Sequence, residues 1–420
     1  MKTYTPELAP AVLDRLRAYA AGFADDFPQA KPAKWAGVYL AGLLLDGDRK
    51  SIEPLSRRVT LPDGLTSADP EQALQPFVNQ SPWDERAVLR RYRARLAGTF
   101  ASPDGVFLFD DVSFPKQGTH SVGVQRQYCG ALGKKANCQV AVSVHYVSPG
   151  GHYPLDLQLY LPESWVSDAP RLDKAGVPKE YRRPRTKPEI ALDLLDRVRA
   201  EGLPGSVVVA DAGYGVSRDL RDGLAARGLH YVVGVTPDLV VFPDRPTWVA
   251  PAAATGGRPQ TRSQLADGNP PPVPIGELAG RLARRAMTWR EGTKGKLTAR
   301  FAWVRVWPGH DWRRGGCADA DPVWLLVEEQ AGGQVKYALS NLPPGTTRAR
   351  AVRLWKSRWP VEQGYQQLKE ELGLDHFEGR SWRGFHHHAA LTLLAYGFLL
   401  LEKRVTPPAN PRRGKKGARR

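Results

Sequence analysis

The chain has few cysteines and no apolar stretch long enough to cross a membrane. Its three cysteines, in 420 residues, are too few and too scattered for a disulfide framework or a zinc cluster. This favours a reducing, intracellular setting. The best candidate for a membrane span, residues 389–401, is too short, and the N-terminus lacks the apolar core of a secretion signal. We therefore expect no membrane partner and a cytoplasmic location.

Negative charge is scarce relative to positive charge. The chain has 60 lysines and arginines against 43 aspartates and glutamates, a net charge of +17. Such an excess favours a polyanionic partner, either nucleic acid or an anionic membrane surface. Because no membrane span is present, nucleic acid is the better candidate. Apolar residues (42%) and charged residues (25%) are otherwise balanced as in ordinary globular proteins.

The N-terminal part of the chain is expected to be helical. Apolar residues recur at helical spacing up to about residue 97, and residues 81–97 form the strongest helix candidate. We expect Ser81 to cap this helix, Pro82 to lie in its first turn and Glu85 to complete a capping box. Its five arginines form either a solvated face or a DNA-contacting face.

Strands and helices alternate in the middle of the chain, which predicts a mixed α/β sheet. Apolar, β-branched runs predict strands over 105–112, 137–147, 230–235 and from Ser206 to Asp211, with helices over 189–202 and 217–228. Residues 237–275 are rich in Pro, Ala and Gly and are expected to be a linker or long loop. Residues 297–340 are β-rich, residues 348–403 are helical, and the last ten residues form a basic tail that could add phosphate affinity.

Carboxylates follow two of the predicted strands. Asp110 and Asp111 end one strand and Asp211 ends another, and strand ends are where ligands gather in open α/β sheets. Together with Glu362 they would form a site of hard oxygen ligands for Mg²⁺ or Mn²⁺. Two such ions can stabilise the attacking and leaving oxygens of a phosphodiester displacement. The alternative for each aspartate is an ordinary cap of the next loop or helix.

A spaced motif surrounds Glu362. Trp355, Arg358, Glu362 and Lys369 are separated by steps of three, four and seven residues, which keeps them near one helix face. Pro360 predicts a helix that begins near Trp359, so that Glu362 lies in a first turn, where negative charge is favoured. The cations would then grip phosphates while the carboxylate holds metal. A charged helix with ordinary salt bridges is the alternative.

Several segments resemble the DDE transposases of bacterial insertion sequences, in the branch labelled DDE superfamily endonuclease. The resemblance spans nearly the whole chain and is carried by "FDDVSFPKQGTHSVGVQRQYCGALGKKANCQVAVSV", "VVVADAGYG", "YALSNLPP" and "RWPVEQGYQQLKEELGLDHFEGRSWRGFHHH". It implies a catalytic, metal-binding triad of Asp110 or Asp111, Asp211 and Glu362. The commoner family spacing, Asp-x-Thr, favours Asp110, but both aspartates remain candidates.

The resemblance also implies DNA contacts. Arg358 and Lys369 correspond to the phosphate-binding residues of the family's Y-R-E-K signature. Trp355 stands where the family usually has tyrosine, and it could stack on a base but has no phenol. Lys116 and Arg126, in the basic stretch behind the aspartates, are expected to hold DNA.

The implied organisation is an RNase H-like, mixed-sheet α/β catalytic core with an N-terminal helical domain and a β-rich insertion. The expected divisions are a helical DNA-binding domain (1–98), the first part of the core (99–236), a Pro-rich linker and β-rich insertion (237–345), the C-terminal helices of the core (346–404) and a basic tail (405–420). The resemblance implies double-stranded DNA, both transposon ends and target, as partner, a homodimer, and a bacterial, nucleoid-associated location. The alternatives are a catalytically silent, domesticated or decayed transposase that binds DNA, and an RNase H-like nuclease.

Two further motifs have open interpretations. Consecutive histidines in "FHHHAAL" (385–391) point in different directions on a helix, so they cannot chelate one zinc ion well. We expect them to begin a helix with imidazoles that face solvent or DNA. Trp303, Trp307 and Trp324 in the β-rich region either pack in the core or stack on DNA bases.

Overall fold

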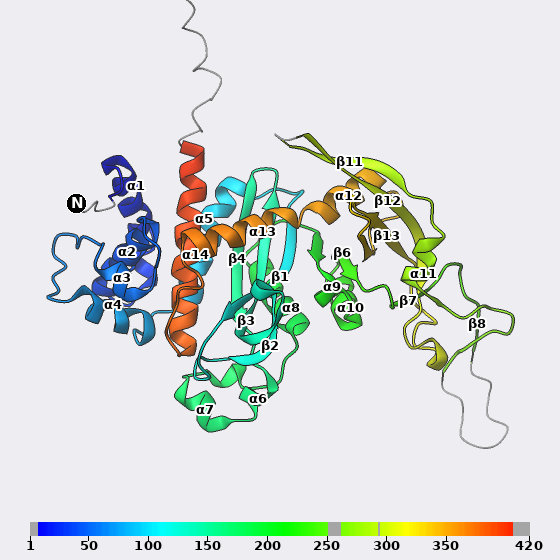
Figure 1. The fold of residues 1–420 in the computed structure, drawn as a ribbon, viewed down its shortest axis with the longest axis horizontal. Coiled ribbons are helices and arrows are strands. Elements are labelled where there is room, and N and C mark those ends of the chain that lie inside the picture. The colour runs from blue at the N-terminus through cyan, green and yellow to red at the C-terminus, as the bar shows by residue number, and fades with distance from the viewer. Residues whose placement is uncertain (1–6, 251–261, 293–294, 406–420) are drawn as a thin grey trace, which may run out of the picture.

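The N-terminal helices pack against the last helix of the chain. The structure is a computed structural model and describes residues 7–250, 262–292 and 295–405; the predicted tail at 406–420 lies outside these ranges. Helix α14 (Trp382–Val405) contacts helices α2, α4 and α5. It stands between α2 and α4 on one side and the sheet on the other, whereas α5 lies on its sheet side and contacts β4 (Figure 1). The first five helices are α1 (Pro10–Ala21), α2 (Ala30–Leu44), α3 (Ile52–Ser56), α4 (Pro70–Asn79) and α5 (Glu85–Phe100).

The predicted start of α5 is wrong. The helix begins at Glu85, and Asp84, not Ser81, is its N-cap, with a side chain that accepts a hydrogen bond from the Arg86 amide at 2.9 Å. The reason is Trp83, which is buried and donates its indole N–H to the Phe77 carbonyl. This anchor holds the preceding residues outside the helix.

The core of the molecule is one large mixed sheet, which confirms the mixed α/β class. Its strand order is β10-β7-β12-β13-β14-β6-β5-β1-β3-β2, with β4 paired to β3 and β11 paired to β12. Strand β1 runs antiparallel to β3 and parallel to β5, and β5 runs parallel to β6. These strands are β1 (Val106–Pro115), β2 (Gln125–Cys129), β3 (Lys134–Ser148), β4 (Gly151–Leu159), β5 (Val207–Ala210) and β6 (His230–Val235).

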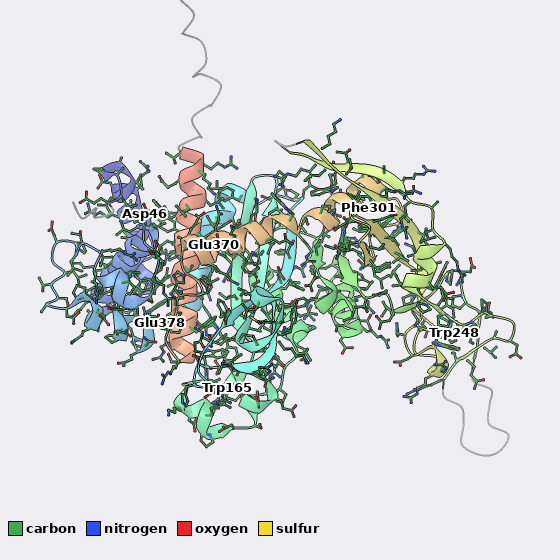
Figure 2. All side chains as sticks on the ribbon, in the orientation of Figure 1. Asp46, Trp165, Trp248, Phe301, Glu370 and Glu378 are labelled. Carbon is green, nitrogen blue, oxygen red and sulfur yellow. The ribbon has the colours of Figure 1, made fainter. Side chains whose placement is uncertain are left out.

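The β-rich region continues the same sheet. Strand β14 pairs antiparallel with β6, so the later strands extend the sheet away from β1. In Figure 2, Phe301 marks β12 on one side of the molecule, and Glu370 marks the C-terminal helical segment over the other strands. The later strands are β7 (Val240–Phe242), β10 (Val273–Pro274), β11 (Arg285–Gly292), β12 (Gly295–Pro308), β13 (Val323–Glu329) and β14 (Val335–Ser340).

The Pro-rich stretch contains more structure than a linker. Besides β7 and β10 it includes the two-stranded sheet of β8 (Trp248–Val249) and β9 (Gln264–Leu265), while residues 251–261 lie outside the described ranges. Next comes α11 (Ile275–Gly280). Trp303 and Trp324 of the β-rich region stack on each other with ring centroids 4.6 Å apart. Packing is therefore what the structure shows for this pair.

The two faces of β1 are covered by different helices. Val106 and Leu108 pack in a cluster with residues of α12 (Arg348–Lys356), whereas Phe107 and Phe109 pack in a cluster that includes α8 (Lys187–Ala200). Successive side chains of a strand point to opposite faces, so Asp110 continues the first series and Asp111 the second. The other helices are α6 (Glu163–Val166), α7 (Ala169–Lys174), α9 (Ala212–Gly215), α10 (Arg218–Ala226) and α13 (Trp359–Gln366), which a π-helical segment (Gln367–Glu371) follows.

The expectation for the histidine motif is wrong. His386, His387 and His388 lie inside α14 with at most 7% of each residue exposed, and they face neither solvent nor DNA. As expected, they point in different directions, and each contacts a different part of the chain. His386 accepts from the Leu159 amide of β4 at 3.3 Å. In the described part of the chain, no helix is long and apolar enough to span a membrane.

Candidate active site

Asp110 and Asp211 come together where the parallel pairing of β1 with β5 ends. Strand β1 itself continues to Pro115, because its antiparallel pairing with β3 extends that far, so the prediction that Asp110 and Asp111 end their strand is wrong. Asp110 lies on β1, just beyond its pairing with β5, and Asp211 directly follows β5. A single guanidinium lies between them: Arg358 Nη2 is 4.0 Å from Asp110 Oδ1 and 3.7 Å from Asp211 Oδ2. Their side chains are 20% and 41% exposed. The site is thus a pair of carboxylates that share one cation and remain reachable from solvent.

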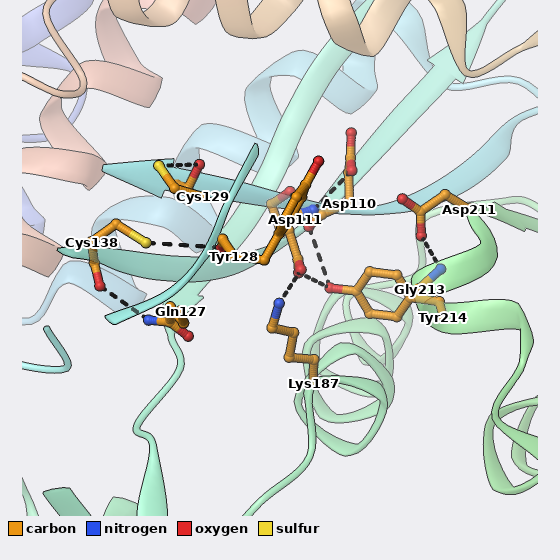
Figure 3. Close-up of polar contacts among 12 residues, drawn as sticks. Asp110, Asp111, Gln127, Tyr128, Cys129, Cys138, Lys187, Asp211, Gly213 and Tyr214 are labelled. Atoms are coloured by element: carbon orange, nitrogen blue, oxygen red, sulfur yellow. Dashed lines mark hydrogen bonds and ion pairs between the residues drawn. The ribbon is translucent and has the colours of Figure 1, made fainter. Parts of the chain in front are cut away.

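Asp111 belongs to the opposite face of β1. Its carboxylate accepts hydrogen bonds from the Lys187 ammonium of α8 and from the Tyr214 hydroxyl of α9. Figure 3 shows Asp111 directed toward Lys187 and Tyr214, and Asp110 pointing away from them. The two adjacent aspartates therefore have different roles: Asp111 holds α8 and α9 against the sheet, and Asp110 faces Asp211.

Asp211 also caps the following helix, as the simpler interpretation predicts. Its Oδ1 accepts from the Gly213 amide at 2.9 Å, which leaves Oδ2 for Arg358. The short helix α9 can lie against β6 because its last residue, Gly215, has no side chain: a Cβ there would come 1.9 Å from the Gly234 carbonyl oxygen. The glycine turn of "DAGYG" therefore sets where Asp211 lies.

Burial disfavours charge on Asp110. It raises the pKa of the Asp110 carboxyl to about 7; the Arg358 guanidinium opposes the shift, and the Asp211 carboxylate adds to it. An ionised Asp110 thus needs a nearby cation. Oxygen donors of this kind suit Mg²⁺ or Mn²⁺, so the two aspartates fit a divalent ion.

Glu362 does not join the two aspartates. It lies in the first turn of α13, which begins at Trp359 as predicted, and its side chain is exposed, with no hydrogen bond or ion pair to the rest of the described chain. Among the described residues, no three His, Cys, Asp or Glu side chains are grouped so that they could hold a metal ion. The structure supplies two of the three expected ligands and places the third on the adjacent helix, one turn after Arg358.

Trp355 is not available to stack on DNA. Only 7% of it is exposed, and its indole N–H donates to Glu328 Oε2 of β13 at 2.6 Å. Lys356 donates to the other oxygen of the same carboxylate, and 1% of Glu328 is exposed. Trp355 therefore links α12 to the β-rich strands, which corrects its expected role as a base contact.

The three other expected DNA contacts differ in how free they are. Lys116 and Lys369 are half-buried and donate to the backbone carbonyls of Phe377 at 2.6 Å and of Ser113 at 3.1 Å. Burial lowers the pKa of both lysines. Arg126 is exposed on β2 and forms no ion pair within the described residues. Arg126 alone of the three is a free surface cation.

Sequence analysis missed several residues that shape the site. Lys187 and Tyr214 have no local signal, because their partner Asp111 is distant in the chain. Tyr365 contacts Ser143 and His145 beside Asp110, and its position three residues after Glu362 puts it on the same helix face. That spacing could have identified it.

An apolar cavity of about 690 Å³ lies away from this site, between α1 and α2. None of the candidate site carboxylates (Asp110, Asp111, Asp211 and Glu362) lines it.

One family model matches more than half of the chain. A family model described as DDE superfamily endonuclease matches residues 22–296, a range that includes Asp110 and Asp211 and ends before Glu362. The probable transposase for insertion sequence element IS701 of Microchaete diplosiphon is 30% identical over 211 residues, which is 50% of this chain and 50% of that protein. The chain therefore spans about half the length of this curated relative.

One solved structure also matches, at a low level of similarity. It is the cryo-EM structure of the piggyBac transposase synaptic complex with hairpin DNA, which is 12% identical and has a TM-score of 0.30. The match covers 86% of this chain and 65% of that one. A TM-score of 0.30 is too low to establish that the two chains share a fold.

Proposed function

The chain belongs to the DDE superfamily endonucleases, and from this premise we propose that it is a metal-dependent DNA transposase that cuts and joins the ends of an insertion sequence. The observation that carries the proposal is the convergence of Asp110 and Asp211 on Arg358, where the parallel pairing of β1 and β5 ends. The name of the IS701 relative supports the same activity. An RNase H-like core is the finer fold assignment that goes with this function.

The proposed metal ligands are Asp110, Asp211 and Glu362, with Asp110 preferred over Asp111. Asp111 already accepts from Lys187 and Tyr214, so its oxygens are committed to structure. The carboxylates of Asp110 and Asp211 each accept one backbone amide through Oδ1. Their side-chain partner among the described residues is the shared Arg358 guanidinium, at 3.7–4.0 Å. Bound Mg²⁺ or Mn²⁺ would supply charge stabilisation to the attacking and leaving oxygens of a phosphodiester.

The chain's own groups position the reacting DNA. In the proposed reaction, water attacks a phosphodiester at the element's end, the P–O bond breaks, and a 3′ hydroxyl is released. That hydroxyl then attacks a phosphodiester of the target DNA and loses its proton as a new P–O bond forms, while the target's own P–O3′ bond breaks and its 3′ oxygen leaves as a hydroxyl. Arg358 is already beside the carboxylates and can pair with a phosphate. Phosphoryl transfer needs mostly positioning and charge stabilisation from a protein.

The proposed partner is duplex DNA, both the element's ends and the target. The net charge of +17 favours phosphate binding, and Arg126 offers a free cation on β2. Two ends must be held together for joining, so we propose that a homodimer forms on DNA. A bacterial cytoplasmic location accompanies this function.

Cleavage of labelled duplex that carries the element's own ends tests the proposal. Wild-type protein should nick this duplex at the element's end only when Mg²⁺ or Mn²⁺ is present. Glu362→Gln should abolish nicking but retain DNA binding. Glu370→Gln, on the exposed surface of the π-helical segment, is the matched control and should nick normally. Binding without cleavage by the wild-type protein would instead support a catalytically silent, DNA-binding transposase.

A further inference from the structure

A chain of buried polar groups connects α13 to β1. The Ser143 hydroxyl donates to the Asp110 backbone carbonyl at 3.1 Å and also contacts the Tyr365 hydroxyl. His145 Nε2 lies 3.0 Å from both hydroxyls, and its Nδ1 lies 3.1 Å from His152 Nε2. This hydrogen-bonded network therefore runs from His145 and His152, on β3 and β4, to the backbone of Asp110, which we propose as a metal ligand.

One arrangement of protons gives every member of this network a hydrogen-bond partner. His152 donates to His145, His145 to Tyr365, Tyr365 to Ser143, and Ser143 to the Asp110 carbonyl. Ser143, His145 and His152 are 2%, 0% and 8% exposed. A buried network in which every member is paired is rigid. The network therefore specifies one position for the Tyr365 side chain.

The helix that carries Tyr365 packs directly on this network. Gly364 makes this possible, because a Cβ at that position would come 2.4 Å from Cε1 of the His152 ring. Arg358, Glu362 and Tyr365 follow at steps of four and three residues, so they share one face of the helical segment. Fixing Tyr365 thus fixes the orientation of the face that presents Arg358 and Glu362.

We infer that Tyr365 and Ser143 are positioning residues that hold the Glu362 face of α13 in register with Asp110. The inference rests on the proposed function, since it concerns the assembly of the same site. Neither hydroxyl is assigned to substrate or metal; each acts through the backbone of Asp110 or through the helix. Small displacements of reacting groups cost large factors in rate, so the loss of one hydroxyl here should reduce turnover without loss of the fold.

The test compares two Tyr→Phe changes. Tyr365→Phe removes the network hydroxyl, and Tyr153→Phe removes a buried hydroxyl of β4 that has no hydrogen-bond partner in the described structure. For Tyr365→Phe we expect a nicking rate about tenfold to a hundredfold lower, a half-saturating Mn²⁺ concentration raised severalfold, and an unchanged Kd for duplex DNA. Tyr153→Phe should match wild type in all three, and both melting temperatures should lie close to that of wild type.

A double-mutant cycle with Ser143→Ala separates positioning from simple destabilisation. If the two hydroxyls act together, Tyr365→Phe and Ser143→Ala should not be additive in nicking rate, and Ser143→Ala alone decides the question if Tyr365→Phe fails to fold. If Tyr365→Phe has the nicking rate and Mn²⁺ dependence of the wild-type protein, this inference is wrong, but the proposed function stands. Absence of metal-dependent nicking in the wild-type protein would overturn the proposed function, and this inference with it.

Discussion

Two runs of adjacent ionisable residues, Asp110–Asp111 at the strand edge and His386–His388 in α14, have opposite environments. Asp110 and Asp211 remain partly exposed and share one guanidinium at 3.7–4.0 Å. The three histidines are buried, and their ring nitrogens lie 2.8–3.3 Å from hydrogen-bond partners, all of them outside α14 except the Trp382 carbonyl. The carboxylates of Asp110 and Asp211 can therefore still bind a cation, whereas the histidine ring nitrogens already have partners.

The hydrogen-bond partners of an ionisable side chain, and not its residue type, therefore decide whether it can bind a ligand or is part of the core. A histidine run in a sequence invites a metal-binding interpretation, yet each ring here joins two parts of the fold. His388, for example, contacts the Tyr39 hydroxyl of α2 and the Gly373 carbonyl after the π-helical segment. Changes at the strand edge should therefore alter activity, and changes in the histidine run should alter stability.

The largest expected effect is on activity at the strand edge. Asp110→Asn should lower nicking by about a thousandfold or more, because a carboxylate that acts in transition-state charge stabilisation is lost. Its stability should not fall. At pH 8 without divalent ions the variant should melt at a higher temperature than wild type, because the ionised carboxyl, whose pKa burial raises to about 7, is destabilising there. Nicking assays and thermal melts check both halves; a folded, fully active variant would contradict the site.

The converse change in the histidine run should affect stability. His387→Ala removes a ring that stacks on Trp83 at 3.7 Å and faces two carbonyls, of Val78 and Trp83. The cavity and the lost bonds should lower the free energy of unfolding by about 3 kcal/mol. Urea unfolding measures this, with Lys403→Ala on the exposed end of α14 as control. Equal unfolding curves for the two variants would show that the buried ring contributes nothing.

Acid should lower the stability that the histidine run contributes. Burial lowers the pKa of His386 and of His388 to about 4, and each neutral ring both donates and accepts a bond. Their folded pKa values lie below the unfolded value of about 6.5, so their stabilisation is complete above pH 6.5 and is lost as pH falls toward 4. At pH 5 each should contribute about 2 kcal/mol less than at pH 7.

Urea unfolding at pH 7, 6 and 5 tests this dependence. His388→Gln should be less stable than wild type at pH 7 but should lose less stability between pH 7 and pH 5, because one titrating ring is gone. A parallel decline of the two proteins would show that burial does not lower the pKa of His388 below its unfolded value.

The smallest expected effect separates the two adjacent aspartates. Asp111→Asn weakens the contacts with Lys187 and Tyr214 and should cost about 1–2 kcal/mol of stability. Nicking should fall by no more than about tenfold, far less than in Asp110→Asn. The same assays, run side by side, decide between the aspartates, and an inactive Asp111→Asn with an active Asp110→Asn would reverse the assignment.

Much of the fold could be predicted from local pattern. The strands around Asp110 and Asp211 and the helix start at Trp359 follow from apolar runs and from Pro360, since these signals act within a few residues. The start of α5 could not, because the distant partners of Trp83 decide it. The Ser81 cap was a plausible local choice that tertiary packing overrode.

The sequence by itself determined that two adjacent carboxylates lie on one strand and that another follows a second strand, that Glu362 lies one turn after Arg358, and that adjacent aspartates on a strand must face opposite ways. Only the tertiary structure decided which aspartate faces Asp211, that Trp355 is tied to Glu328, and that the histidines are interior. The physical reason is range. Backbone periodicity is encoded over a few residues, whereas the partner that buries, charges or neutralises a side chain comes from elements far away along the chain.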